Sequence, residues 1–395
     1  MRIVFVQYGD YRVAVENFAR GGEETYAAQR YSVDLVADLA RKCEHVSVIC
    51  VNADPYEEEL ANGVHARGLR LYRDVTVPEL VARVAELRPT HLVSRSPIRP
   101  LLRWGTRSGV RTLPLLATSF PRIGGLRVRF RYWQDARTLS NPAIEVVGNH
   151  AINSCLDLRR IGVPAEKIVP WDWPATVAPS DRPPKAREMR EGPVRLFYAG
   201  VVSEDKGVGD CLGALRILRE RGHDARFSVA GSGEIAHFEE MARQFGVAEA
   251  ATFLGRIPHQ RVVALMNEHD LTVVPSRHSY PEGLPLTIYD SYCSRTPLIA
   301  SDHPMFRGRV EDGFAALVFR AGSPESLADR AEELLRSPDL YARLSRNSEA
   351  AWAKLQLPVR WGDLLQQWLA GPGEVQALLS RFSLASGPYD QQGAR

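Results

Sequence analysis

The sequence predicts an α/β protein with two Rossmann-like domains that face each other across a cleft. Buried runs of Val, Ile, Leu and Phe alternate with amphipathic segments through both halves of the 395 residues, as parallel sheets covered by helices require. Glycine-containing loops follow several of these runs, at the ends where such folds bind ligands. Six prolines between Pro170 and Pro193 indicate a linker, and clefts between domains are preferred ligand sites.

The first domain, residues 1–173, is expected to begin with a buried strand at Arg2–Gln7. A long loop over 8–20 should follow, and Gly21-Gly22 should then lead into a helix over 25–42. Gly22 at such a turn lets a backbone N–H approach a phosphate, although a plain tight turn fits equally well. Further strands are predicted at residues 46–51, 91–94 and 112–117, and further helices near 77–87 and 101–108.

An arginine-rich segment follows the last of these strands and its terminal loop, Thr118-Ser119-Phe120-Pro121. In the run LRVRFRYW, Arg127, Arg129 and Arg131 are interleaved with Val, Phe, Tyr and Trp. One interpretation is a cationic, aromatic rim for an anionic acceptor or a membrane surface. The other is a solvated face whose alternate residues are buried.

The second domain, residues 194–357, repeats the α/β pattern after a linker over 174–193. Its expected strands lie at 196–199, 227–230, 252–254, 271–274, 296–300 and 316–319. Its expected helices lie at 208–221, from after Gly233 to 245, and at 260–267, 286–293, 324–336 and 339–354. Within it, Glu282 and Asp290 lie eight residues apart, about 12 Å at helical rise. That span suits two hydroxyl-rich ends of one ligand better than a metal ion.

Composition excludes several classes of protein. A net charge of +3 and the lack of zinc-finger or RNA-stacking motifs argue against a nucleic-acid partner. Five scattered cysteines predict unpaired thiols in a reducing cytoplasm. No apolar run is long enough to span a bilayer. Only five of the 50 basic residues are lysines, so a lysine in a motif position is less readily accidental.

Residues 194–370 resemble glycosyltransferase family 4, whose members have the two-domain GT-B architecture and use nucleotide sugars with retention of configuration. The resemblance is carried by FYAGVVSEDKGV, VAGSG, FLGRI, the stretch from Pro275 to Asp302 and a closing WGDLL helix. RIVFV, Gly21-Gly22 and GVPAEKIV extend it more loosely to the first half. It implies that a helix over about 358–370 packs back on the first domain. The Gly-, Ser- and Gln-rich tail over 371–395 is typical of disorder.

The resemblance also implies roles for individual residues. Glu282 would face the transferred sugar, Asp290 would bind the ribose, and Lys206 would hold the diphosphate. The full set of implied donor-binding residues is Gly22, Gly200, Lys206, Gly231, Arg256, Glu282, Gly283, Leu284 and Asp290, with Lys206 and Glu282 also catalytic. Thr118, Ser119 and Arg122 are the acceptor-binding candidates. No metal and no cofactor are expected.

The chain departs from the family at three positions. Asp290 stands where the family has Glu, and Ser119-Phe120 replaces a His-Asp pair that the family often carries. Val201 stands where the family usually has the arginine of its phosphate clamp. The compensating cations considered are Arg256, Arg277, His278, Arg95 and Arg122.

The expected function is transfer of a sugar from a nucleoside-diphosphate sugar to the hydroxyl of a small-molecule, saccharide or lipid-linked acceptor. Two alternatives remain open at this point: a sugar phosphorylase or nucleotide-sugar epimerase with the same fold, and a non-catalytic protein that binds a nucleotide or sugar. The sequence leaves peripheral membrane contact open and is silent on oligomeric state, donor base, sugar and acceptor.

Overall fold

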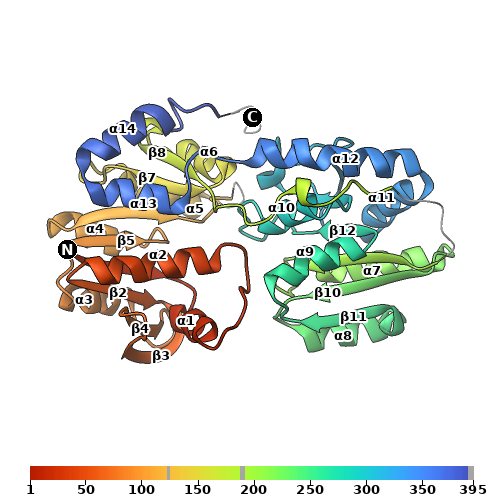
Figure 1. Ribbon diagram of the computed structural model, residues 1–395, viewed down its shortest axis with the longest axis horizontal. Coiled ribbons are helices and arrows are strands. Elements are labelled where there is room, and N and C mark those ends of the chain that lie inside the picture. The colour runs from red at the N-terminus through yellow and green to blue at the C-terminus, as the bar shows by residue number, and fades with distance from the viewer. Residues whose placement is uncertain (122–124, 187–191, 390–395) are drawn as a thin grey trace. The chain divides into compact units, whose positions relative to one another are not determined.

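The protein divides into two compact α/β units (Figure 1). The computed structural model describes residues 1–121, 125–186 and 192–389. Unit 1 comprises Met1–Glu24, Ala28–Pro174 and residues 357–389, and unit 2 comprises Thr25–Ala27 and Ala175–Gln356. None of the described helices combines the length and apolarity that crossing a bilayer requires.

Unit 1 is built on an eight-stranded sheet in the order β3-β4-β2-β1-β5-β6-β7-β8. Its strands are β1 (Arg2–Gln7), β2 (His45–Cys50), β3 (Asn52–Glu59), β4 (His65–Arg70), β5 (His91–Ser94), β6 (Arg111–Leu116), β7 (Val147–His150) and β8 (Ile168–Trp171). The β3–β4 pair is antiparallel and the other pairs are parallel. Its helices are α1 (Tyr11–Ala19), α2 (Gln29–Lys42), α3 (Val77–Glu86), α4 (Arg99–Arg107), α5 (Leu126–Leu139), α6 (Ile152–Ile161), α13 (Trp361–Ala370) and α14 (Pro372–Phe382).

The segment after β1 is helical, so the long loop predicted over 8–20 is wrong. The Asp10 side chain accepts a hydrogen bond from the Arg12 N–H and caps α1. Tyr11, Ala14 and Val15 then bury one face of this helix. The next helix, α2, begins at Gln29, four residues later than predicted.

Two strands at the edge of unit 1, β3 and β4, were not predicted. The β3 sequence, NADPYEEE, is mostly polar and has a burial pattern in which only Ala53 is buried. An exposed edge strand lacks the run of buried residues from which the other strands were inferred.

The C-terminal helices return to unit 1. Trp361, Leu364, Leu365 and Trp368 of α13 belong to the same hydrophobic core as the β1 and β2 residues. The disorder expected of the tail is wrong for α14, because Val375 and Leu378 bury that helix in the same core. Residues 390–395 lie outside the described chain.

Unit 2 is built on a six-stranded, fully parallel sheet in the order β11-β10-β9-β12-β13-β14. Its strands are β9 (Val194–Ala199), β10 (Ala225–Ala230), β11 (Ala251–Gly255), β12 (Leu271–Val274), β13 (Leu298–Ser301) and β14 (Ala316–Phe319). Its helices are α7 (Val208–Glu220), α8 (Ile235–Gln244), α9 (His259–Glu268), α10 (Leu286–Cys293), α11 (Pro324–Arg336) and α12 (Pro338–Leu355).

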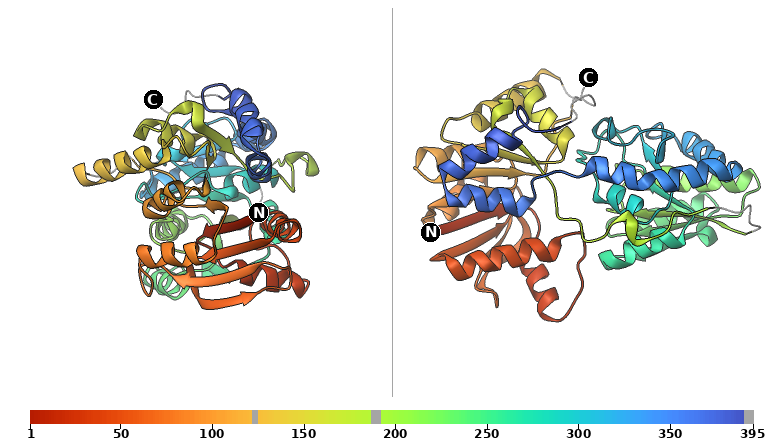
Figure 2. Two further views of the ribbon diagram at one scale, coloured as in Figure 1. Left: turned by 90° about the vertical axis from the view of Figure 1, so that its left-hand side faces the viewer. Right: turned by 45° about the horizontal axis from the view of Figure 1, so that its top comes forward.

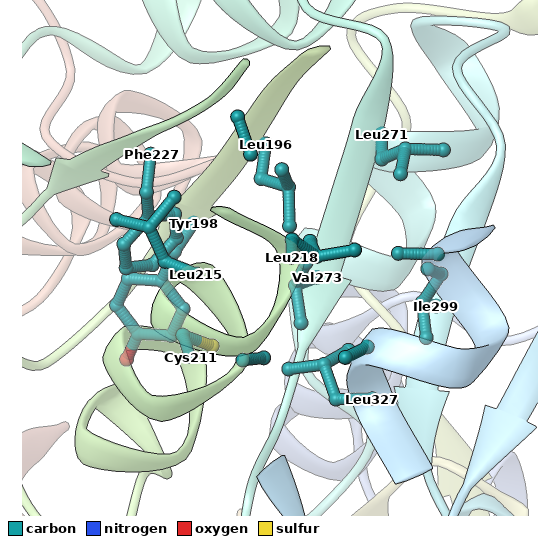
Figure 3. Packing of buried hydrophobic residues seen from close by; sticks show 14 of the residues in the cluster. Leu196, Tyr198, Cys211, Leu215, Leu218, Phe227, Leu271, Val273, Ile299 and Leu327 are labelled. Atoms are coloured by element: carbon teal, nitrogen blue, oxygen red, sulfur yellow. The ribbon is translucent and has the colours of Figure 1, made fainter. Parts of the chain in front are cut away.

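The core of unit 2 lies between this sheet and helices on its faces. Figure 3 shows Leu196 of β9 and Val273 of β12 packed with Leu215 and Leu218 of α7 and with Leu327 of α11. These side chains are all buried. They fix the sheet and helices and so set the positions of the loops that join them.

Part of the predicted linker is anchored to unit 2. Lys185 donates hydrogen bonds to the carbonyls of Asn267 and His269 at 2.8 and 2.5 Å, and to Thr296 Oγ1 at 3.1 Å. The two carbonyls lie at the C-terminal end of α9, where the helix dipole favours a cation. One of the five lysines therefore has a structural role. Residues 187–191 lie outside the described chain.

Candidate functional site

The candidate site of unit 2 lies where the strand order reverses. From β9 the chain builds outward through β10 to β11, and then crosses to the other side of β9 to place β12, β13 and β14. The loops that leave the carboxyl ends of neighbouring β9 and β12 therefore diverge. In open parallel sheets this divergence forms the usual ligand site. Lys206 lies in the loop after β9, and Glu282 lies in the loop after β12.

Glycines bring the loops after β9 and β10 together. The Gly200 N–H donates to the carbonyl of Ala230, and the Val202 N–H donates to that of Ser232. At Gly231, with φ of +143°, an added Cβ would lie 1.7 Å from the carbonyl oxygen of Gly200. Only glycine fits there, so Gly200 and Gly231 serve a close approach of two backbones.

Lys206, in the loop after β9, and Glu282, in the loop after β12, form an ion pair. Lys206 Nζ lies 2.5 Å from Glu282 Oε1, with side chains only 13% and 8% exposed. Ser276 Oγ donates to the same oxygen at 2.7 Å. The Lys206 amine also lies 4.3 Å from the centre of the Tyr280 ring. This cation–π contact adds to the stabilisation of the charged amine. The sequence predicted both charged residues but not their direct contact.

Surrounding hydrogen bonds position this pair. Ser301 Oγ of β13 donates to the Ser276 carbonyl at 2.7 Å, which fixes the residue that binds Glu282. His303 accepts a hydrogen bond from the Met305 N–H through Nδ1, so its Nε2 carries the proton and donates to the Tyr280 carbonyl at 3.2 Å. Burial lowers the pKa of His303, consistent with this neutral form. Burial, reinforced by the charge of Glu282, raises the pKa of Tyr280.

A cavity of about 280 Å³ opens beside the two glycine loops. Its lining includes Gly200, Val201, Gly231, Arg256, His259 and Asp290, together with residues 25–27, which belong to unit 2. Asp290 lies within α10 and accepts a hydrogen bond from His259 Nε2 at 3.0 Å. Both side chains are buried. A buried carboxylate held at the wall of a cavity is suited to bind ligand hydroxyls.

The position of the family's clamp arginine is occupied by an exposed valine. Val201 is 49% exposed and lines the cavity, while its carbonyl accepts a hydrogen bond from the Tyr198 hydroxyl at 2.6 Å. Arg277 is committed elsewhere: it makes two hydrogen bonds to Asp210, at 2.9 and 2.6 Å, and contacts Glu204. The hydrogen bond to Asp210 raises the pKa of Arg277.

The other considered cations differ in their availability. Arg256 lines the cavity and donates to Ser232 Oγ at 3.3 Å, so it remains a candidate. His278 is paired with Asp302 at 2.8 Å. Arg95 belongs to unit 1, where it lies over the rings of Trp173 and Trp361. Arg122 lies outside the described residues.

The remaining donor candidates are placed as follows. Gly283 and Leu284 continue the loop after Glu282, and Leu284 is buried. The helical-rise estimate between the two acids does not apply, because Glu282 precedes the start of α10 at Leu286. Gly22 follows the end of α1, and its N–H donates to the Asn17 carbonyl at 2.8 Å. That N–H is already used within the chain, so the structure lends no support to Gly22 as a phosphate contact, which stays a prediction.

The acceptor candidates lie in unit 1, after β6. The Thr118 N–H donates to Asn149 Oδ1 at 3.2 Å, and Asn149 returns a hydrogen bond to the Thr118 carbonyl. Ser119 is buried, and its hydroxyl has no hydrogen-bond partner among the residues that the structure describes. A buried, unsatisfied hydroxyl is uncommon and fits a missing polar partner.

Sequence reasoning missed His259, Ser276, Tyr280 and Ser301. Each becomes significant only through a contact that the sequence alone does not show, such as that of His259 with Asp290. A lone His or Ser gives no signal of its own. Across the described residues, no group of three His, Cys, Asp or Glu side chains is arranged to hold a metal ion.

Part of the chain matches a known family model and known proteins. Residues 181–351, which contain the Lys206–Glu282 pair and the cavity residues after β9, match the family model described as glycosyl transferases group 1. The chain is 29% identical over 199 residues to an alpha-D-kanosaminyltransferase of Streptomyces kanamyceticus, a match that covers 48% of this chain and 50% of that protein. The chain thus spans about half the length of this curated relative.

Solved structures extend the likeness to nearly the whole chain. Sucrose-phosphate synthase from Thermosynechococcus elongatus has a TM-score of 0.65 at 16% identity, covering 94% of this chain and 100% of that one. HepE of Anabaena, solved in complex with UDP, has a TM-score of 0.64 at 13% identity with the same coverage. At these identities the likeness concerns the fold, and the fold of this chain is GT-B.

Proposed function

We propose that this protein is a retaining glycosyltransferase that moves a sugar from a nucleoside-diphosphate sugar to an acceptor hydroxyl. The observation that carries the proposal is that a buried Lys–Glu pair and a cavity with a buried carboxylate share the loops of one topological switch point. A nucleoside diphosphate needs a pocket for base and ribose and a cation for its phosphates. The two features supply both.

The roles follow from the chemistry of each group. The base and ribose occupy the cavity, whose volume of about 280 Å³ lies just below the roughly 300–1,000 Å³ of ligand pockets and so suits the nucleoside rather than the whole donor. Asp290 accepts hydrogen bonds from the ribose, and Lys206 binds the diphosphate. Lys206 and Ser276 donate their hydrogen bonds to Glu282 Oε1, and Oε2 binds hydroxyls of the transferred sugar.

In the reaction, the bond between the sugar C1 and the β-phosphate oxygen breaks as the acceptor oxygen bonds to C1 on the same face. The acceptor proton passes to the departing phosphate oxygen. Negative charge accumulates on that phosphate, and a preorganised cation lowers the barrier. Lys206 therefore contributes more to the transition state than to the ground state. This mechanism uses no side-chain nucleophile and no metal ion.

Relatives support the donor class. HepE has been solved with UDP and with UDP-glucose, and the S. kanamyceticus relative is named as a kanosaminyltransferase. We extend these to a nucleotide-sugar donor here and leave the acceptor as a small molecule, a saccharide or a lipid-linked hydroxyl. We place the reaction in the cytoplasm, because all five cysteines are free thiols, as in reducing compartments.

The first test is a thermal-shift panel of UDP, GDP, ADP, CDP and dTDP. A ligand that binds only the folded state raises the free energy of unfolding by mass action, by about 2.7 kcal/mol at a hundredfold excess over Kd. The melting temperature rises accordingly. We expect one diphosphate to stand out, and the shift to fall strongly in Lys206→Ala. Lys354→Ala is the matched control, because Lys354 also contacts a glutamate, Glu311, and lies over an aromatic ring.

The second test follows products of the corresponding nucleotide sugar with and without acceptor alcohols. Acceptor-dependent glycoside with retained configuration is expected, and Lys206→Ala should slow its formation about a hundredfold or more. Turnover without acceptor would instead indicate an epimerase. Binding of the diphosphate with no turnover in any acceptor mixture would refute transfer while keeping the site.

A further inference from the structure

The first two turns of α5 carry an exposed apolar stripe. Leu126, Phe130 and Trp133 are 81%, 56% and 51% exposed. Their spacing of four and then three residues places them within about 60° of one another around the helix. The buried residues of α5 are instead confined to its last five positions, Asp135, Ala136, Thr138 and Leu139. The first turns of the helix carry no fully buried side chain, although Tyr132 packs against Phe120 and the Arg131 carbonyl accepts a hydrogen bond from Arg99. Figure 2 (left) shows α5, in the yellow-orange of residues near 130, reaching out from its unit.

The structure bears on the two sequence-based interpretations of this segment. The second interpretation, a solvated face whose alternate residues are buried, is wrong for Phe130, while Val128 and Tyr132 are half-buried. The segment is helical, so Phe130 shares a face with Trp133, and both are exposed. Three large apolar side chains together on a surface need an explanation that single ones do not.

Arginines flank this stripe on both sides. At helical spacing, Arg129 lies on one side of it, Arg127 and Arg131 lie on the other, and all three side chains are exposed. The only acid of the helix, Asp135, is buried, and its Oδ1 lies 3.5 Å from Arg99 Nε. Burial raises the pKa of Asp135. The exposed face of α5 is thus cationic without a compensating acid of its own.

The aromatic residues on this face contact each other and a neighbouring arginine. The rings of Phe130 and Trp133 stack with centroids 5.6 Å apart, and the guanidinium of Arg137 lies 5.6 Å from the Trp133 ring. Ordering side chains before binding reduces the entropy lost on binding. An indole beside arginines is also the combination that settles at the boundary between lipid headgroups and acyl chains.

We propose that this face of α5, formed by Leu126, Arg127, Arg129, Phe130, Arg131 and Trp133, docks on the surface of a bilayer that contains anionic lipids. The apolar stripe enters the headgroup–acyl boundary and the flanking arginines contact lipid phosphates, as in interfacial amphipathic helices. An acidic protein would satisfy the arginines but offers no general site for a stripe with cations on both sides. The proposal concerns α5 alone and does not depend on the proposed reaction.

The experiment is flotation of the full chain with vesicles of phosphatidylcholine, with and without phosphatidylglycerol. We expect binding only to the anionic vesicles, weakening with salt. Each arginine near an anionic surface contributes about fivefold in partitioning, so Arg129→Gln/Arg131→Gln should weaken binding about 25-fold. Phe130→Ser/Trp133→Ser should weaken it by about tenfold or more through loss of apolar burial.

Matched controls replace equally exposed residues elsewhere in the chain. Tyr72→Ser removes an exposed aromatic, and Arg73→Gln/Arg346→Gln removes the same charge as the α5 pair. Both controls should bind like the wild type. The blue shift of tryptophan emission on anionic vesicles should disappear in Trp133→Phe, whose binding is retained.

Two results would overturn the proposal. One is a wild-type protein that does not float with anionic vesicles, the result expected if the partner is an acidic protein or nucleic acid. The other is binding that the α5 variants and the controls share equally. Because the substituted side chains are exposed, their melting temperatures should match the wild type, which separates loss of docking from loss of folding.

Discussion

Lys206 and Glu282 neutralise each other before any ligand arrives. Their 2.5 Å contact joins the loops after β9 and β12, and it means that the cation proposed for the diphosphate is already partnered by the acid proposed for the sugar. A donor must compete with Glu282 for Lys206. Binding of the phosphates and release of the carboxylate toward the sugar are therefore coupled in the proposed function.

This coupling predicts opposite effects of Glu282→Gln on binding and on turnover. Glutamine keeps an acceptor for Ser276 but removes the charge that holds Lys206. The affinity for the bare nucleoside diphosphate should rise by about fivefold, which is about 1 kcal/mol, while turnover should fall about a hundredfold as the contact to the sugar is lost. Calorimetric titration and initial rates measure the two quantities.

Glu311→Gln, which changes the partner of Lys354, is the control for a general effect of lost charge and should alter neither quantity. Weaker diphosphate binding in Glu282→Gln than in the wild type would contradict the idea that the two residues compete.

The His259–Asp290 contact predicts a positioning role for His259. A hydrogen bond to a charged group contributes about 1.5–3 kcal/mol, so the wild type should bind ribose-containing diphosphates about tenfold or more tightly than an analogue that lacks the contacted hydroxyl. In His259→Ala the carboxylate of Asp290 loses its fixed direction, and this ratio should shrink toward one. The measurement is a set of Kd values for ribo, 2′-deoxy and 3′-deoxy diphosphates.

The ratio between ribo and deoxy diphosphates distinguishes this positioning role from a general loss of stability. A merely structural histidine would weaken all three ligands equally and leave the ratio unchanged. Asp290→Asn should reduce the ratio of Kd values in the same way. His237→Ala, at an exposed position of α8, is the control and should leave the ratio at its wild-type value.

Gly231 should be intolerant of any side chain. Its φ of +143° and the 1.7 Å approach of an added Cβ to the Gly200 carbonyl mean that alanine would force the loops after β9 and β10 apart. We expect Gly231→Ala to lower stability by about 2 kcal/mol or more and to abolish the thermal shift by the diphosphate. Gly246→Ala is the control: φ is +69° there, but nothing lies within 4 Å of the added atom, so only a backbone cost of about 1 kcal/mol is expected.

How far the sequence predicted the site depended on the kind of signal. The bounds of α10 were predicted as 286–293 and confirmed as Leu286–Cys293, because an apolar strand, a proline-rich turn and a second apolar strand bracket the helix. The order of glycines, Lys206 and the two acids along the chain was likewise readable. What failed depended on contacts. The His259–Asp290 pair joins residues 31 apart, and nothing local marks such a histidine.

The segment of α5 shows a different limit. Arginines at every second position fit both a strand with a solvated face and a helix, and the decision lies in whether the intervening aromatics find a core. Tyr132 packs against the buried Phe120, but Phe130 remains exposed. The helical period prevails and places Phe130 beside Trp133. For α1, the sequence does carry a helix signal, an Asp10 cap followed by apolar residues at Tyr11, Ala14 and Val15. The helix has only nine residues, too few for its periodicity to stand out from a loop.

Val201 offers a test of the phosphate clamp itself. Its side chain is 49% exposed and faces the cavity, while the loop is held by backbone hydrogen bonds and by the Tyr198 hydroxyl. Val201→Arg should therefore fold like the wild type and add a charge-assisted contact to the diphosphate, worth about 1.5–3 kcal/mol, or about tenfold or more in Kd. Turnover should rise as well if the added charge stabilises the departing phosphate.

Val201→Gln is the control: it supplies similar reach without charge and should gain little affinity. Equal affinities in the arginine and glutamine variants would mean that the phosphates do not lie beside residue 201, and the placement of the donor along Lys206 and the glycine loops would have to be abandoned.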